Sequence, residues 1–119
     1  MAVASTRIIT ITMSGDINVP SMSFSAAANA VAPGDIDVFS LTAGANTITL
    51  PTGGSTPKGA TIIPPPANVQ TITLKGITGD TGIALHKTDP TSISFDTAPP
   101  ASFVLTVGGT IDGLRVVWT

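Results

Sequence analysis

The sequence lacks several residue types from which catalytic and stabilising sites are commonly built. It contains no cysteine and no tyrosine, and its seven acidic residues are all aspartate. Without cysteine the chain has neither a disulfide framework nor a thiolate that could act as a nucleophile or ligand. A single histidine and the absence of glutamate leave few partners for a zinc site or a catalytic triad. We therefore predict a protein that is not an enzyme, with no catalytic residue, no cofactor and no bound metal.

Charged residues are also scarce, at 10% of the chain against about 25% in ordinary globular proteins. The net charge is −2, and the five basic residues are scattered, which argues against a nucleic-acid partner. Hydrophobic residues reach 42%, yet no run is long enough to cross a bilayer, so no membrane partner is expected. The alternating start at residues 8–12 does not form the apolar core of a cleaved leader. So few charges favour a surface covered by copies of the chain or by neighbouring proteins.

Glycine and proline recur at short intervals and separate segments of about five to eight residues. This spacing predicts an all-β fold, an antiparallel β-sandwich (jelly-roll-like), with little or no helix. The length predicts a single sandwich domain over residues 1–119, with a short N-terminal arm at residues 1–6. The expected strands are Arg7–Met13, Ser21–Ser25, Asp35–Leu41, Asn46–Leu50, Ala60–Ile63, Val69–Lys75, Gly82–His86, Ser92–Asp96, Ser102–Val107 and Ile111–Trp118.

Several segments alternate apolar and polar residues, as a strand with one buried face must. In residues 47–50, Ile48 and Leu50 share one face while two threonines share the other, and residues 71–74 repeat the arrangement. The predicted core or interface positions are Ile48, Leu50, Ile72, Leu74, Ile93, Phe95, Phe103, Leu105, Val107, Leu114, Val116 and Trp118.

Two segments depart from simple alternation. In Asp35–Leu41, Ile36 and Val38 lie on one face while Phe39 and Leu41 lie on the other. Either this strand is buried on both sides or a bulge shifts its register. Ser25–Ala32 is the only helical candidate, because it is rich in alanine and ends before a Pro-Gly pair, but it is short and has no apolar stripe.

The polar residues suggest structural roles more strongly than chemical ones. His86 stands near a predicted strand end, where it would at most make a pH-sensitive contact, and no Gly-x-Ser-x-Gly elbow accompanies it. Asp35 and Asp37 are two residues apart and could chelate a hard cation such as Ca²⁺. Solvated turn residues explain them more simply, and cation binding by this pair is left open. The glycine-rich segment Gly76–Gly82 lacks the following helix of a phosphate loop, so we interpret it as a turn.

The pattern resembles the small β-sandwich or jelly-roll structural proteins in the virions of tailed bacteriophages. The residues that carry this resemblance are Ala45–Pro51, Lys58–Pro65, Thr71–His86 and Gly113–Trp118. The resemblance implies a non-enzymatic virion component, made in the host cytoplasm. The first choice that it implies is a capsid decoration (cement) protein that clamps neighbouring major capsid proteins as a homo-oligomer, with a trimer expected.

Two alternatives accompany this interpretation. The resemblance is compatible with a tail-tip, baseplate or fibre-associated module of the same architecture, whose partners would be tail or baseplate proteins. A carbohydrate-binding adhesion module belongs to a separate class. Such a module should expose aromatic side chains or calcium ligands, and the sequence offers few of either.

Overall fold

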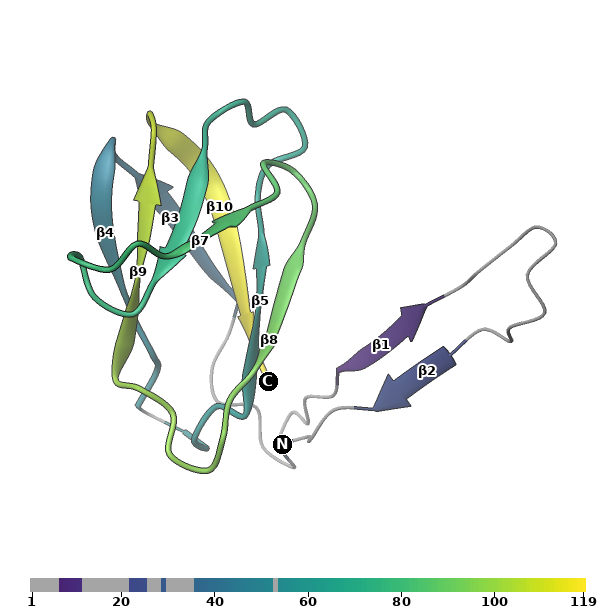
Figure 1. Ribbon diagram of the computed structural model, residues 1–119. Helices are drawn as coiled ribbons and strands as arrows, with labels where there is room; N and C mark the ends of the chain where they lie inside the picture. The colour runs from purple at the N-terminus through teal and green to yellow at the C-terminus, as the bar shows by residue number, and fades with distance from the viewer. Residues whose placement is uncertain (1–6, 12–21, 26–28, 30–35, 53) are drawn as a thin grey trace, which may run out of the picture.

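Ten β-strands and their connections make up the part of the chain that the computed structural model describes, which is residues 7–11, 22–25, 29, 36–52 and 54–119 (Figure 1). These residues include no helix long and apolar enough to cross a membrane. The strands are β1 (Ile8–Ile11), β2 (Met22–Ser25), β3 (Asp37–Leu41), β4 (Gly44–Thr49), β5 (Gly59–Ile63), β6 (Ile72–Lys75), β7 (Ile83–Leu85), β8 (Thr91–Ser94), β9 (Ser102–Val107) and β10 (Ile111–Trp118).

Strands β3 to β10 form two four-stranded antiparallel sheets that face each other (Figure 1). The first sheet has the order β3-β10-β5-β8 and the second has the order β4-β9-β6-β7. Four antiparallel pairs are nested in the sequence: β3 with β10, β4 with β9, β5 with β8, and β6 with β7. Nested pairing of eight strands over two sheets is the jelly-roll arrangement. The predicted antiparallel, jelly-roll-like sandwich is therefore confirmed.

Strands β1 and β2 lie outside this sandwich, which corrects the prediction of one sandwich containing all ten segments. They pair only with each other, as a two-stranded antiparallel sheet that projects to one side of the body (Figure 1). Every residue of β1 is exposed. The two sheets end in the edge strands β3, β8, β4 and β7, and neither β1 nor β2 pairs with any of them. The expected arm at residues 1–6 lies outside the described residues.

The core lies between the two sheets and is built from the inward faces of the alternating strands. Nine of the twelve predicted positions are buried, whereas Leu74, Ile93 and Phe95 are partly buried and pack against the core. Trp118 and Phe103 are in tilted contact, with ring centroids 6.2 Å apart. The buried predicted residues are Ile48, Leu50, Ile72, Phe103, Leu105, Val107, Leu114, Val116 and Trp118, and the core also contains Leu41, Ala60, Ile62 and Ile111.

Strand β3 is regular, and the irregularity expected there lies in its neighbour. Phe39 and Leu41 face the core, whereas Val38 is 64% exposed, so β3 is not buried on both sides. The register of the β3–β10 pair shifts between Asp112 and Leu114, where Gly113 has a φ of +83°. Glycine adopts this left-handed conformation without steric penalty, so β10 supplies the bulge.

Two further expectations differ in detail. The sixth strand begins at Ile72 and not at Val69, because the Asn68 side chain bonds both the N–H and the carbonyl of Gln70 and holds that segment in a turn. In the helical candidate, Ser25 ends β2 and Asn29 makes an isolated bridge. The other residues of that candidate lie outside the described part of the chain.

Candidate interaction surfaces

His86 takes part in a local turn. Its Nδ1 accepts hydrogen bonds from the backbone N–H groups of Asp89, at 2.9 Å, and Thr88, at 3.2 Å. The same nitrogen lies 3.5 Å from a carboxylate oxygen of Asp89, and both side chains are well exposed. The Thr88 hydroxyl also lies 3.4 Å from this nitrogen, and together these contacts close the loop after β7.

Asp37 makes a structural contact between two strands. Asp37 Oδ2 accepts a hydrogen bond from the indole Nε1–H of Trp118 at 2.7 Å, which links β3 to β10. Within the described part of the chain, no three His, Cys, Asp or Glu side chains are grouped so that they could hold a metal ion. Asp35 lies outside the described residues, so cation binding by Asp35 and Asp37 stays an untested interpretation.

The glycine-rich segment Gly76–Gly82 connects β6 to β7 as a turn, as the sequence predicts. Asp80 Oδ2 accepts the backbone N–H groups of Gly76, at 3.1 Å, and Ile77, at 3.0 Å. Gly82 has a φ of +78°, and a Cβ there would lie 2.6 Å from the carbonyl oxygen of Leu74. The N–H groups of Gly76 and Ile77 are therefore used within the loop itself, not presented to a phosphate.

Exposed apolar side chains are the most distinctive surface feature of the molecule. Single exposed hydrophobic residues are ordinary, but residues that cluster on one element indicate a contact surface. Two clusters stand out, one on the β1–β2 hairpin and one at the start of β3. The large exposed hydrophobic residues are Ile8, Ile9, Ile11, Phe24, Ile36, Val38, Val69, Ile77 and Ile83.

Arg7 anchors the hairpin to the sandwich. Its side chain is buried, and the guanidinium donates to the Ser92 hydroxyl at 2.8 Å, to the Ile93 carbonyl and to the Ser94 hydroxyl, all on β8. The guanidinium also lies so close to Gly59 of β5 that a Cβ at that glycine would be 2.7 Å from it. The sequence does not predict this role of Arg7, because its hydrogen-bond partner Ser92 lies 85 residues away in the chain.

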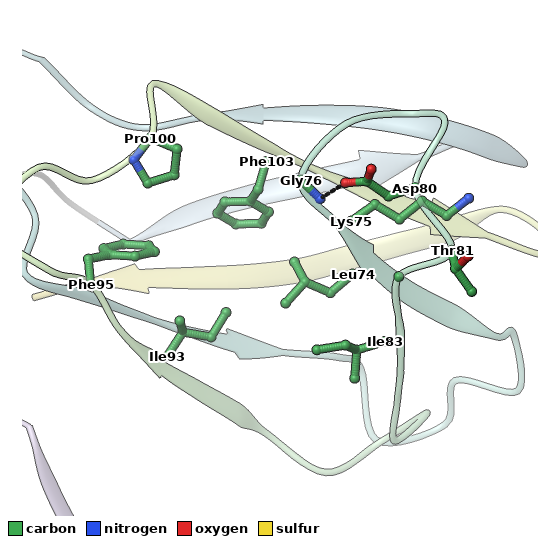
Figure 2. Close-up of a pocket in the computed structure, with 11 residues that line it drawn as sticks. Leu74, Lys75, Gly76, Asp80, Thr81, Ile83, Ile93, Phe95, Pro100 and Phe103 are labelled. Carbon is green, nitrogen blue, oxygen red and sulfur yellow. Dashed lines mark hydrogen bonds between the residues drawn. The ribbon is translucent and has the colours of Figure 1, made fainter.

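An apolar cleft opens between β7 and β8, the free edges of the two sheets. Figure 2 shows the side chains of Leu74, Ile83, Ile93, Phe95 and Phe103 around it. The cleft has a volume of about 570 Å³, and its polar lining residues include Lys75, Asp80 and Thr81. Such a lining favours an apolar ligand. It brings no acidic and basic side chain together toward one point in the cleft.

Comparisons with family models, with curated protein sequences and with solved structures gave no match for this chain.

Proposed function

We propose that the chain is a non-enzymatic structural component of a bacteriophage virion, a decoration (cement) protein that stabilises the head by binding neighbouring major capsid proteins. The observation that carries the proposal is the concentration of exposed aliphatic and aromatic side chains, on a surface that has few charges. Burial of such side chains gives roughly 25 cal/mol per Å² of apolar area, which favours association. The jelly-roll body, an architecture found in viral capsid and lectin domains among others, is compatible with this role but does not by itself imply it.

The surface we assign to the capsid contact is the outer face of β3. Ile36 and Val38 are 57% and 64% exposed there, and β3 is an edge strand of its sheet. Arg115 stands opposite Val38 on β10 and offers one cation beside the apolar residues. An apolar centre with a charge at its margin is typical of protein–protein contact surfaces.

Binding to undecorated capsids tests the proposal directly. Purified protein is mixed with capsids of the phage that encodes it, and bound protein is measured by co-sedimentation. We expect saturable binding and capsids that resist heat better when decorated. The variant Val38→Asp should weaken binding strongly, because it places a charge in the apolar contact. The matched control Thr47→Asp adds the same charge at an exposed position of β4 in the other sheet and should bind normally.

The same experiment distinguishes the decoration role from the tail-module and adhesion alternatives. Tail or baseplate assemblies and host cell-wall glycans are tested in parallel with capsids. Binding to tails alone would replace the decoration role by the tail module, and glycan binding alone would favour adhesion. A protein that binds none of the three would overturn the virion proposal.

A further inference from the structure

Among the described aspartates, Asp112 differs both in the residue that follows it and in its surroundings. It is the only aspartate in the sequence that precedes a glycine. Its side chain is exposed and makes no hydrogen bond or ion pair within the described part of the chain. A backbone nitrogen reacts most readily with a preceding aspartyl side chain when it belongs to glycine, because glycine has no Cβ to obstruct the approach.

The other described aspartates are each less suited to this reaction. Asp37 and Asp80 accept hydrogen bonds through Oδ2, and each precedes a β-branched residue that crowds the following nitrogen. Asp96 accepts the N–H of the residue that follows it, which is also β-branched. Asp89 precedes a proline, whose backbone nitrogen carries no hydrogen. Asp112 alone among them combines an unbonded carboxyl group with a following glycine.

The backbone at Asp112 lies at a break in the sheet. The register of β3 and β10 passes directly from Asp112 to Leu114, and the pairing of β10 with β5 begins only at Arg115. Gly113 is therefore outside the paired register of both neighbouring strands. It has a φ of +83°, and a Cβ placed there would meet no atom within 4 Å. The peptide unit between Asp112 and Gly113 is consequently less constrained than those of the continuous ladder that follows it.

We propose that Asp112 is a site of spontaneous isomerisation to isoaspartate. The Gly113 nitrogen attacks Cγ of the protonated Asp112 carboxyl group and forms an N–Cγ bond. The hydroxyl of the carboxyl group leaves with the N–H proton as water, and the product is a cyclic succinimide.

Water then reopens the succinimide ring in one of two ways. Breaking the N–Cγ bond restores aspartate, whereas breaking the bond between the nitrogen and the main-chain carbonyl carbon leaves Gly113 linked through the side chain of Asp112. The water lost in the first step is regained in the second, so no other reactant is needed and the mass of the chain is unchanged. The reaction is independent of the proposed function, because it involves this chain and water alone.

The isoaspartyl linkage adds one carbon atom to the backbone of β10 at the bulge. Arg115 to Trp118 pair with β5, and β3 holds the start of this segment from the other side, whereas Ile111 and Asp112 pair with β3 alone. The extra carbon therefore displaces the more weakly held end of the strand. Ile111 is buried in the core and stands opposite Leu41, so its displacement lowers the stability of the sandwich.

Prolonged incubation of the full chain at physiological temperature and pH tests the site. A synthetic peptide of residues 108–117 is incubated in parallel until it has accumulated isoaspartate, which shows the reaction without the fold. Digestion and mass spectrometry with electron-transfer fragmentation then distinguish isoaspartyl from aspartyl peptides of equal mass. We expect isoaspartate at Asp112 in the folded chain before any other described aspartate. Its absence at Asp112, or its earlier formation at Asp80, Asp89 or Asp96, would overturn the proposal.

Variants at the same position separate this chemistry from general ageing of the protein. Asp112→Glu keeps the charge but lengthens the side chain, which disfavours ring closure, so the isoaspartyl signal should be lost. Asp112→Asn should convert faster, because ammonia leaves more readily than water, whereas the matched control Asp96→Glu should keep the original signal. An isoaspartyl signal that persists in Asp112→Glu would contradict the assignment. The changes are at exposed positions and should leave the fold intact, which circular dichroism checks.

The effect on the sandwich is measured on the modified chain itself. Aged protein is separated by chromatography into isoaspartyl and unmodified fractions, and each is unfolded in urea. We expect a lower urea midpoint for the isoaspartyl fraction, because the end of β10 no longer pairs in register. Equal midpoints for the two fractions would overturn the displacement of Ile111.

Discussion

The hydrogen bond between Trp118 and Asp37 offers a quantitative test of how β10 is held against β3. Trp118 is 2% exposed, and its Nε1–H donates to Asp37 Oδ2 at 2.7 Å on the adjacent strand. Trp118 is the only tryptophan and the chain has no tyrosine, so tryptophan fluorescence reports on this site alone.

The expected change in the free energy of unfolding depends on which hydrogen-bonding group each substitution leaves without a partner. Asp37→Ala leaves the buried indole N–H without its acceptor, at a cost of about 1–3 kcal/mol in the free energy of unfolding. Asp37→Asn keeps an oxygen that can accept and should cost less than about 1 kcal/mol. Trp118→Phe should cost more than Asp37→Ala, about 2–4 kcal/mol, because it also leaves a cavity where the larger ring packed.

Urea unfolding followed by circular dichroism measures these differences, with fluorescence as a second probe in the variants that keep Trp118. The double variant of Asp37→Ala and Trp118→Phe completes a cycle, and we expect a coupling energy of about 1–2 kcal/mol. Asp112→Ala is the control, since Asp112 is exposed on β10 and should change stability by less than about 0.5 kcal/mol. An Asp37→Ala effect no larger than this control, or a coupling near zero, would refute the reasoning.

Two further predictions concern the core and the β6–β7 turn. Phe103→Ala and Val116→Ala should each lower the free energy of unfolding by about 2–5 kcal/mol, and unchanged thermal melting would show that the inward register is wrong. Gly82→Ala should cost more than about 1–2 kcal/mol, because it combines a positive φ with a Cβ that meets backbone. Gly79→Ala, where a Cβ meets open space, should stay within about 0.5 kcal/mol, and equal losses in the two glycine variants would contradict this argument.

The alternation of apolar and polar residues predicts well which side chains of a strand face the core, because the buried positions of a strand are mostly apolar. Ile48 and Ile72 each alternate with threonine, and both are almost completely buried in the second sheet. Alternation fails where neighbouring strands cover an outward residue. Val104 stands outward on β9, yet it is 5% exposed, because β9 is an inner strand with Thr47 and Lys75 beside Val104 in the register.

The remaining errors come from contacts between distant residues. The sequence of β1 reads as an ordinary strand, and nothing local distinguishes a strand in a sandwich from one in a projecting hairpin. Arg7 contacts β8 only in the folded chain, so residue spacing alone does not predict that its side chain anchors the hairpin. The order of apolar residues in Asp35–Leu41 predicts burial on both faces or a bulge there, whereas the bulge lies in β10, where Gly113 permits it.

The β1–β2 hairpin contributes nothing to the core of the sandwich. None of the side chains in the buried core cluster comes from β1 or β2, so the sandwich is packed without them. The apolar area of Ile9, Ile11 and Phe24 therefore adds little to the folding free energy of the single chain. Substitutions at Ile9, Ile11 or Phe24 should therefore change the free energy of unfolding little, whereas substitutions at Phe103 or Val116 should lower it.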